Sequence, residues 1–214
     1  MTDELSFGLA FFFERRPAHA TTGGEFLKQE FYNAVSGSPV IAAVKDFEGL
    51  SRCLETGEIQ IVFILFGNVC DIGDIVKRVK SAGKFALVHA DLIEGLSSKE
   101  IAVDYIHRNT EADGIISTRQ GFIRRARELH LCSILRVFVI DSMSLSGLGC
   151  LESVRPDFIE ILPGVMPKII RKVCAVTSVP ILAGGLITDK EDVIGALEAG
   201  AMAISTTNQD VWLM

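Results

Sequence analysis

The sequence predicts an α/β protein, a compact parallel (β/α)8 barrel of the TIM type over 38–214 that is preceded by an N-terminal appendage over 1–37. From Ser38 onward, short apolar runs of strand type alternate with segments of helical spacing, and eight such units succeed one another. Apolar runs separated by helices are typical of a parallel sheet whose faces are covered. Eight units favour closure into a single barrel domain over an open sheet.

The expected strands are apolar runs that stop at turn-forming residues. They cover 39–44, 59–66, 85–92, 114–117, 134–140, 158–162, 181–183 and 201–204. Helices are expected between them at 46–54, 71–82, 98–108, 120–129, 144–154, 165–176 and 189–199. No proper helix comes after the last strand, so the eighth helix of the barrel is expected to be incomplete.

Composition limits the class of protein. The chain has 214 residues, of which 49% are hydrophobic, and this is enough for one large core. Its formal net charge of -6 does not favour general electrostatic attraction to nucleic acid or to an anionic membrane. We therefore expect no membrane partner, and any RNA contact would have to be local. The five cysteines include no C-x-x-C pair, which argues against a disulfide framework or a zinc site, and we expect no metal. We expect a cytoplasmic protein, since no signal peptide or membrane span is evident. We also expect no cofactor.

The N-terminal part of the chain differs in pattern from the barrel segment. An apolar run over 6–13 leads into a charged connection that is rich in proline and glycine, over 14–24. We interpret 1–37 as a docking arm or an ill-ordered leader that takes no part in chemistry.

Two of the expected strands end at residues that expose backbone N–H groups. The seventh run stops at a glycine pair, and the eighth stops at a row of hydroxyl and amide side chains. In a (β/α)8 barrel these strand ends are neighbours, and the loops after strands 7 and 8 are the usual phosphate site. Glycine lets the backbone come close enough to an anion to donate its N–H, although a glycine pair also suits a plain tight turn. The expected phosphate-binding residues are Gly184, Gly185, Ser205, Thr206, Thr207 and Asn208.

Polar residues at the other strand ends are expected to meet at the same rim. Carboxylates there would accept hydrogen bonds from the hydroxyls of a small polyol monophosphate. His89 and Asp91 could instead pair with each other within a polar layer of the barrel. Arg119 could be a surface residue without a ligand contact. A buried Glu160 needs a partner, either Arg136 or a ligand hydroxyl. The expected polyol-side residues are His89, Asp91, Ser117, Arg119, Arg136, Asp141 and Glu160.

The competing hypothesis is an enzyme that acts on a triose or polyol phosphate. Lys45, after the first strand, is the rim lysine that could form a Schiff base, and His89 with Asp91 could act as general base and orienter. Asp91, Asp141 and Glu160 could instead hold Mg²⁺ beside a phosphate. The sequence has no paired lysine at the end of the sixth or seventh strand, where aldolase-type barrels commonly place one.

Six ordered motifs resemble the glycerol uptake operon antiterminator family. The resemblance covers 38–212 and implies a (β/α)8 barrel that senses glycerol 3-phosphate as its effector. It further implies a protein that is not an enzyme but acts on the leader of a messenger RNA, so that transcription of glycerol uptake genes passes a terminator. The motifs are VHADL at 88–92, DGIISTR at 113–119, RVFVIDS at 136–142, PDFIEILPG at 156–164, AGGLI at 183–187, and STTN at 205–208 with Trp212 after it.

The sequence departs from the family pattern at two positions. Ala42 stands where the family pattern has a basic residue in the first strand, and Leu135 stands where it has Gln before the arginine of the fifth strand. These departures leave the phosphate loops untouched and bear on the polyol or RNA contacts, so a divergent ligand stays open.

Basic residues that could contact RNA are densest after the fourth strand. The RNA-binding candidates there are Arg124, Arg125 and Arg127, and further cationic clusters lie at 77–84 and 168–172. The sequence has no ribonucleoprotein aromatic signature, zinc knuckle or helix-turn-helix pattern, so recognition would use arginines, loops and the rim. A homo-oligomer would present two faces to one RNA, but the sequence does not fix the number of subunits.

Overall fold

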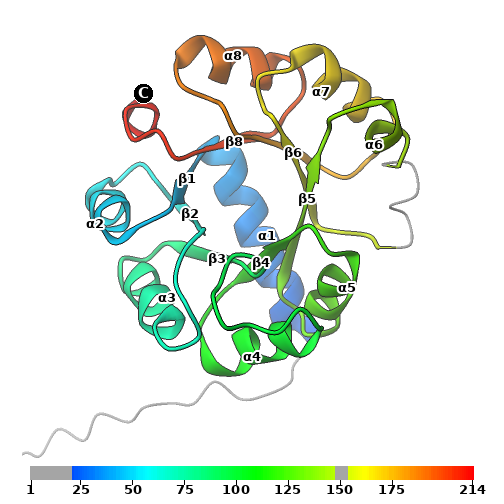
Figure 1. The fold of residues 1–214 in the computed structure, drawn as a ribbon. Coiled ribbons are helices and arrows are strands. Elements are labelled where there is room, and N and C mark those ends of the chain that lie inside the picture. Colours follow the sequence, from blue (N-terminus) through cyan, green and yellow to red (C-terminus); the bar gives the residue numbers. More distant parts are fainter. Residues whose placement is uncertain (1–20, 148–153) are drawn as a thin grey trace, which may run out of the picture.

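The computed structural model describes residues 21–147 and 154–214, and in it eight parallel strands form a closed barrel (Figure 1). Each strand pairs with the next along the chain, and β8 pairs with β1 to close the sheet. The predicted fold class is confirmed. The strands are β1 (Val40–Val44), β2 (Ile61–Ile64), β3 (Phe85–His89), β4 (Gly114–Ser117), β5 (Cys132–Phe138), β6 (Phe158–Leu162), β7 (Ile181–Gly184) and β8 (Ala203–Thr206).

Helices surround the barrel, and one more helix lies across its end (Figure 1). After β8 the structure has only a short 3-10 turn, η2 (Val211–Leu213). The helix that would follow the last strand is therefore incomplete, as predicted. The expected helix at 144–154 is α6, and its part over 148–153 lies outside the described residues. The helices are α1 (Thr21–Gly37), α2 (Phe47–Glu55), α3 (Ile72–Ser81), α4 (Ile101–Asn109), α5 (Gln120–Glu128), α6 (Ser142–Gly147), α7 (Pro167–Cys174) and α8 (Lys190–Glu198).

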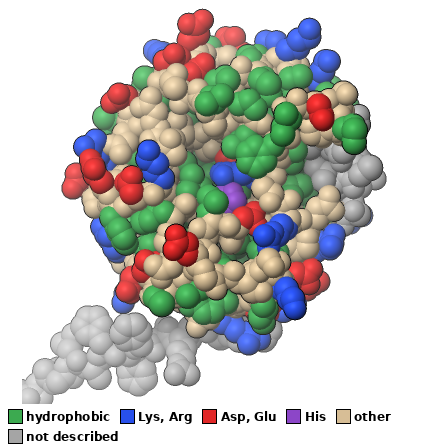
Figure 2. Space-filling view, viewed as in Figure 1, with side chains coloured by type: hydrophobic (Ala, Val, Ile, Leu, Met, Phe, Trp, Pro, Cys, Tyr) green, Lys and Arg blue, Asp and Glu red, His purple; other side chains and the backbone are tan. Residues whose placement is uncertain are grey.

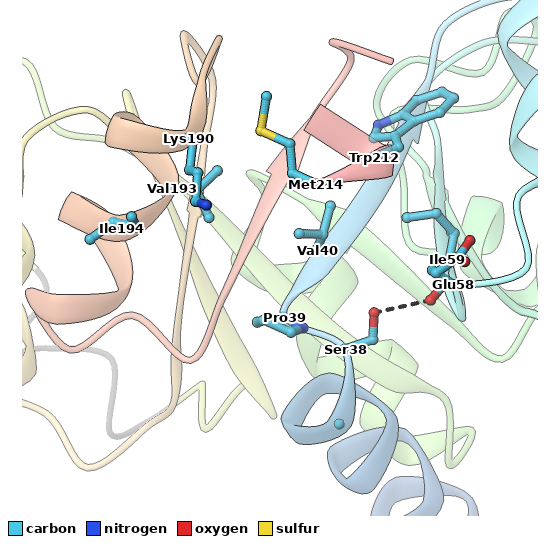
Figure 3. Close-up of a pocket in the computed structure, with 11 residues that line it drawn as sticks. Ser38, Pro39, Val40, Glu58, Ile59, Lys190, Val193, Ile194, Trp212 and Met214 are labelled. Carbon is cyan, nitrogen blue, oxygen red and sulfur yellow. Dashed lines mark hydrogen bonds between the residues drawn. The ribbon is translucent and has the colours of Figure 1, made fainter. Parts of the chain in front are cut away.

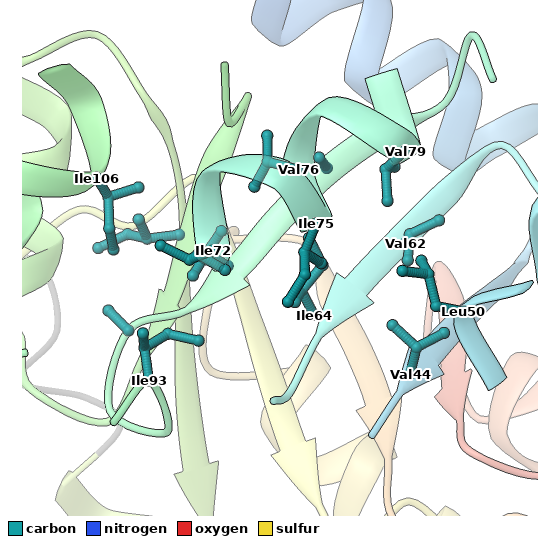
Figure 4. Close-up of a cluster of buried hydrophobic side chains, with 14 of the residues drawn as sticks. Val44, Leu50, Val62, Ile64, Ile72, Ile75, Val76, Val79, Ile93 and Ile106 are labelled. Carbon is teal, nitrogen blue, oxygen red and sulfur yellow. The ribbon is translucent and has the colours of Figure 1, made fainter. Parts of the chain in front are cut away.

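The strands are buried on both faces, which explains why they read as continuous apolar runs. Alternate residues fill the inside of the barrel, namely Ile41, Ala43, Ile61, Phe63, Leu87, Ile116, Cys132, Ile134, Phe158, Leu182 and Ala203. The intervening residues pack against the surrounding helices. Figure 4 shows this outer layer, where Ile72, Ile75, Val76 and Val79 of α3 lie against Val62 and Ile64 of β2.

The helix α1 closes the end of the barrel at which the strands begin. Phe31 and Val35 are fully buried with the inner side chains, and the ring of Phe31 lies 5.6 Å from Phe85 and 5.3 Å from Phe158 in edge-on contacts. The described part of the predicted appendage is therefore a helix that packs into the barrel. Residues 1–20, with the apolar run over 6–13, lie outside the described residues. Within 21–147 and 154–214, every helix is too short or too polar to span a membrane.

Candidate functional site

The open end of the barrel is its mouth, at which all eight strands end. Figure 2 looks onto the mouth and shows histidine, basic and acidic side chains gathered at its centre, among apolar ones. This is the rim at which the sequence places the candidate residues.

The strand ends of β7 and β8 lie side by side. Gly184 pairs with Ser205 in the register of the parallel ladder. Beyond the ladder, the Thr206 hydroxyl donates to the carbonyl of Ile187 at 2.8 Å, and the Asn208 amide donates to the carbonyl of Thr188 at 2.8 Å. The adjacency that the barrel topology predicts is observed, and these bonds tie the two turns to each other.

Both turns leave backbone donors unused. Within the described residues, the N–H groups of Gly185, Leu186 and Thr207 have no protein acceptor. The backbone of Gly185 and Leu186 is left-handed, with φ values of 75° and 63°, which is routine for glycine and uncommon for leucine. Such a conformation turns consecutive N–H groups away from the sheet ladder. These donors are suited to an anion.

The six predicted phosphate residues divide into two groups. The side chains of Ser205, Thr206 and Asn208 donate to groups of the protein, so they fix the turns. Gly185 and Thr207 supply unused N–H groups, and the Thr207 side chain is exposed. Gly184 is needed for packing, because a Cβ there would lie 2.6 Å from a carboxylate oxygen of Glu160 and 2.6 Å from the Ser205 hydroxyl.

A glycine that the sequence analysis did not single out supports the same turns. A Cβ on Gly164 would lie 2.9 Å from the backbone nitrogen of Gly184, and the N–H of Gly164 donates to the carbonyl of Gly185 at 3.0 Å. The loop after β6 is therefore in direct backbone contact with the loop after β7. The only signal in the sequence was the Pro-Gly pair that ends the β6 motif.

A buried ion pair joins the neighbouring strands β5 and β6 below the mouth. Arg136 and Glu160 are register partners on β5 and β6, and the Nε of Arg136 lies 2.6 Å from Oε2 of Glu160. The Ser205 hydroxyl donates to Oε1 of Glu160 at 2.5 Å. Glu160 is fully buried, so the structure supplies the Arg136 partner that the sequence analysis required. The two terminal nitrogens of Arg136 bond to no acceptor in the described ranges and are open to a ligand.

The carboxylate of Asp91 holds the end of β4. It accepts hydrogen bonds from the Ser117 hydroxyl at 3.0 Å, from the Thr118 N–H at 2.7 Å and from the Thr118 hydroxyl at 3.1 Å. The Nε of Arg119 lies 3.4 Å from the same carboxylate, and the Arg119 side chain is 44% exposed. Arg119 also donates to the carbonyl of Ser98 at 2.8 Å, so it bridges two loops of the rim.

His89 is buried, and among the described residues its Nδ1 has no hydrogen-bond partner. Its Nδ1 lies 3.9 Å from Asp91, which is too far for a hydrogen bond. Burial, together with the positive charge of Arg136, lowers the pKa of His89 to about 4 against the opposing effect of Asp91. The imidazole is therefore neutral near pH 7. A buried ring nitrogen without a partner at the mouth is a candidate contact for a ligand hydroxyl.

The remaining polyol-side candidate, Asp141, lies apart from this buried group. It is exposed and accepts hydrogen bonds from the N–H and the hydroxyl of Ser144, both at 2.8 Å, at the start of α6. These bonds lower the pKa of Asp141. Lys45 is exposed beyond the end of β1. Among the described residues, no group of three or more His, Cys, Asp or Glu side chains is placed to hold a metal ion.

The two departures from the family pattern face away from the mouth. Ala42 packs in the layer between the sheet and helices α2 and α3, and Leu135 packs in the corresponding layer on the other side of the barrel. Their neighbours on the strands, Ala43 and Arg136, are the residues on the inner face. In this chain, neither departure lines the predicted polyol side.

The three RNA candidates on α5 have different surroundings. Arg125 forms ion pairs with Asp104 and Glu128, so its guanidinium is occupied. Arg127 donates to the carbonyl of Val154 at 3.3 Å, whereas Arg124 is exposed. Only Arg124 is fully available at the surface of this helix.

A pocket of about 260 Å³ lies outside the barrel, away from the mouth (Figure 3). It is bordered by the start of β1, by α8 and by η2. A full helix after β8 would cover the sheet at this place. Its lining is largely apolar and includes Val40, Ile59, Val193, Ile194, Trp212 and Met214. Because it collects no group of convergent polar side chains, we place the candidate ligand site at the mouth instead.

Comparisons with known proteins agree with the overall fold. The chain is 44% identical over 178 residues to the uncharacterized protein YgcP of Escherichia coli strain K12, covering 83% of this chain and 93% of that protein. The crystal structure of the glycerol uptake operon antiterminator regulatory protein of Listeria monocytogenes superimposes with a TM-score of 0.78 at 34% identity, covering 81% of this chain and 94% of the other. An antiterminator-related protein of Thermotoga maritima gives a TM-score of 0.72 at 28% identity, with coverages of 83% and 99%.

More distant matches, at 11% to 17% identity, include several barrel enzymes, and they show the fold alone. Residues 40–212, by contrast, match the family described as "Glycerol-3-phosphate responsive antiterminator". That match spans the whole barrel from β1 to η2 and includes every predicted site residue. The chain therefore belongs to the glycerol-3-phosphate responsive antiterminator family.

Proposed function

We propose that this protein binds glycerol 3-phosphate at the barrel mouth and, in response, binds the leader of a messenger RNA as a transcription antiterminator of glycerol utilisation genes. One observation supports the ligand site most directly. The turns after β7 and β8 are neighbours, and their N–H groups at Gly185, Leu186 and Thr207 have no acceptor among the described residues. Family membership supports the regulatory role.

The ligand would bridge the two sides of the mouth. Its phosphate would accept hydrogen bonds from the N–H groups of Gly185, Leu186 and Thr207. Its hydroxyls would reach the terminal nitrogens of Arg136, which can donate, and the neutral ring of His89, whose unpartnered nitrogen can accept or donate according to its tautomer. The buried Glu160 would keep Arg136 in place, because it already bonds to that guanidinium.

RNA binding would result from a shift between two states of the loops. A ligand that contacts both sides of the mouth stabilises the arrangement in which those loops are closed. It can favour RNA binding only by the difference between its affinities for the two states. By reciprocity, RNA should raise the affinity for glycerol 3-phosphate by the same factor.

The phosphate site can be tested by introducing one carboxylate at Gly185. Gly185→Asp sets a negative charge beside the phosphate, so the affinity for glycerol 3-phosphate is expected to fall at least about 100-fold in titration calorimetry. Gly185→Asn is the matched control, because Asn has nearly the same size and also tolerates the left-handed backbone. It is expected to bind at least about tenfold more tightly than Gly185→Asp. Equal affinities of the two variants would refute the phosphate site.

A turnover assay separates the regulator from the enzyme. The protein is incubated with glycerol 3-phosphate, with and without Mg²⁺, at concentrations that saturate binding. We expect the ligand to be recovered unchanged. Formation of a product that depends on the protein, and that is lost in Gly185→Asp, would favour an enzyme that acts on a polyol phosphate.

A further inference from the structure

A second pocket lies at the closed end of the barrel, opposite the mouth. It measures about 250 Å³ and lies between α1 and the start of β6, and its lining is Lys28, Gln29, Tyr32, Asp157 and Phe158. Figure 1 shows α1 behind the barrel, on the side away from the mouth that Figure 2 displays. None of these five residues is used by the ligand site proposed above.

The chemistry of this pocket suits a planar ring with polar edges. Tyr32 is 42% exposed, and its ring lies 6.4 Å from the ring of Phe158 at an angle of 32°. The Nζ of Lys28 bonds to Asp157 at 2.8 Å, and this pair supplies both a donor and an acceptor beside the ring. The Gln29 amide adds a further polar group. Aromatic stacking combined with edge hydrogen bonds is how single-stranded RNA bases are held.

The charges of the helices are distributed unevenly between the two ends of the barrel. Helices run antiparallel to the strands in this fold, so their last turns lie at the closed end, around α1. Basic residues occupy the last turns of five of them, namely Arg52 of α2, Arg78 and Lys80 of α3, His107 and Arg108 of α4, Arg125 and Arg127 of α5, and Arg171 and Lys172 of α7. Acidic residues occupy the first turns of α2, α3, α4 and α8, towards the mouth.

Several cations at the closed end are available to a polyanion. Arg155, two residues before Asp157 of the pocket, is exposed and has no ion-pair partner among the described residues. Arg108, Arg171 and Lys172 are likewise exposed and form no ion pair in the described ranges. An acidic chain can therefore offer a local basic surface, which the whole-chain charge of -6 conceals.

From this geometry we infer that the closed end of the barrel is the RNA-binding surface, with one unpaired base stacked on Tyr32 and the adjoining phosphates on Arg155 and the basic helix ends. The inference rests on the proposed RNA-binding function and assigns its location. It moves the centre of the contact from α5 to α1 and β6. The strand β6 links this surface to the mouth, because Phe158 of the pocket is two residues from Glu160.

The test begins with an RNA that the whole protein selects. Single-stranded RNA is enriched from a randomised pool on the wild-type chain in the presence of glycerol 3-phosphate, and affinities are then measured by fluorescence anisotropy. Tyr32→Ala is expected to weaken binding about tenfold or more, since stacking on one aromatic ring carries roughly that factor. Tyr32→Phe keeps the ring and should bind within about twofold of wild type. Arg155→Glu should lower the slope of log affinity against log salt by about 0.7 or more.

The outcomes distinguish the location from the function. If RNA is enriched but Tyr32→Ala and Arg155→Glu both bind like wild type, the inferred surface is wrong while the proposed function stands. If no RNA is enriched with glycerol 3-phosphate present, the RNA-binding function fails and the inference fails with it. If Tyr32→Ala changes the sedimentation of the protein and leaves RNA affinity unchanged, the pocket is a contact between copies of the chain, which also overturns the inference. Unaltered thermal midpoints for the variants show that they are folded.

Discussion

The two sides of the barrel mouth are built from different chemistry. On the β7–β8 side, the groups left without an acceptor within 21–147 and 154–214 are backbone N–H groups at Gly185, Leu186 and Thr207. On the β3–β6 side, the groups are ionic or titratable side chains, and Arg136 and Glu160 form an ion pair in the interior. One side offers donors without charge, and the other offers a buried ion pair beside the neutral ring of His89.

This difference separates binding from stability. Backbone N–H groups at a turn are solvated when no ligand is present, so altering them costs the fold little. A buried charge requires its partner, because an uncompensated charge in the interior costs several kcal/mol. We therefore expect changes on the β7–β8 side to act on ligand affinity and changes on the β3–β6 side to act on the free energy of unfolding as well.

The largest effect is expected for Glu160→Ala. This change leaves Arg136 buried without its carboxylate and removes the acceptor of the Ser205 hydroxyl. The free energy of unfolding is expected to fall by about 3–5 kcal/mol, measured by urea denaturation.

A double variant sharpens this result. Arg136→Met combined with Glu160→Met replaces the pair by apolar side chains, and it is expected to regain most of the lost stability, since such replacements are often neutral. Gly185→Asp, on the other side of the mouth, should keep its stability within about 1 kcal/mol of wild type. Glu160→Ala with wild-type stability would show that the ion pair does not hold the barrel together.

His89 gives the second effect, which depends on pH. Its pKa in the folded protein is about 4, below its ordinary value, so the unfolded chain binds more protons than the folded one between about pH 6.5 and pH 4. The stability that the neutral ring contributes is complete above that range and is lost as the pH falls through it. Between about pH 6.5 and pH 5 the loss is expected to be about 2 kcal/mol.

Substitution isolates this contribution. In His89→Gln, the urea midpoint should fall less steeply with pH than in wild type. His130→Asn is the control, because His130 is exposed and its left-handed backbone tolerates Asn. It should retain the wild-type pH dependence. Identical pH profiles for wild type and His89→Gln would mean that His89 is not held neutral by burial.

Much of the fold can be predicted from the sequence, because a strand buried on both faces has to read as an apolar run. The helix α1 cannot be predicted in this way. Its buried residues, Phe31 and Val35, lie in a largely polar segment, and their role depends on where the end of the barrel lies in space. The pocket beside Tyr32 is hidden for the same reason, since it joins α1 to a strand that begins more than a hundred residues later.

The candidate site was predictable in part. The barrel topology alone places Gly184 beside Ser205, and that expectation is met. Which donors stay unused was not predictable, because it depends on local bonds such as that from Thr206 to the carbonyl of Ile187. Strand alternation carries one further signal. Leu135 directly precedes the inward Arg136 and so has to point outward, away from any ligand.

The smallest effect is expected for Arg119, a charge on the β3–β6 side that is not buried. Its ion pair with Asp91 is 3.4 Å long and its side chain is 44% exposed, so Arg119→Ala should cost less than about 1 kcal/mol of stability. The uncovered Asp91 would repel an anionic ligand, and the affinity for glycerol 3-phosphate should fall about two- to fivefold at low salt and less at high salt. Arg124→Ala, which removes an exposed arginine on α5, should change neither quantity. An affinity loss for Arg119→Ala as large as that of Gly185→Asp, and insensitive to salt, would place the phosphate on the β3–β6 side and reverse the roles of the two sides.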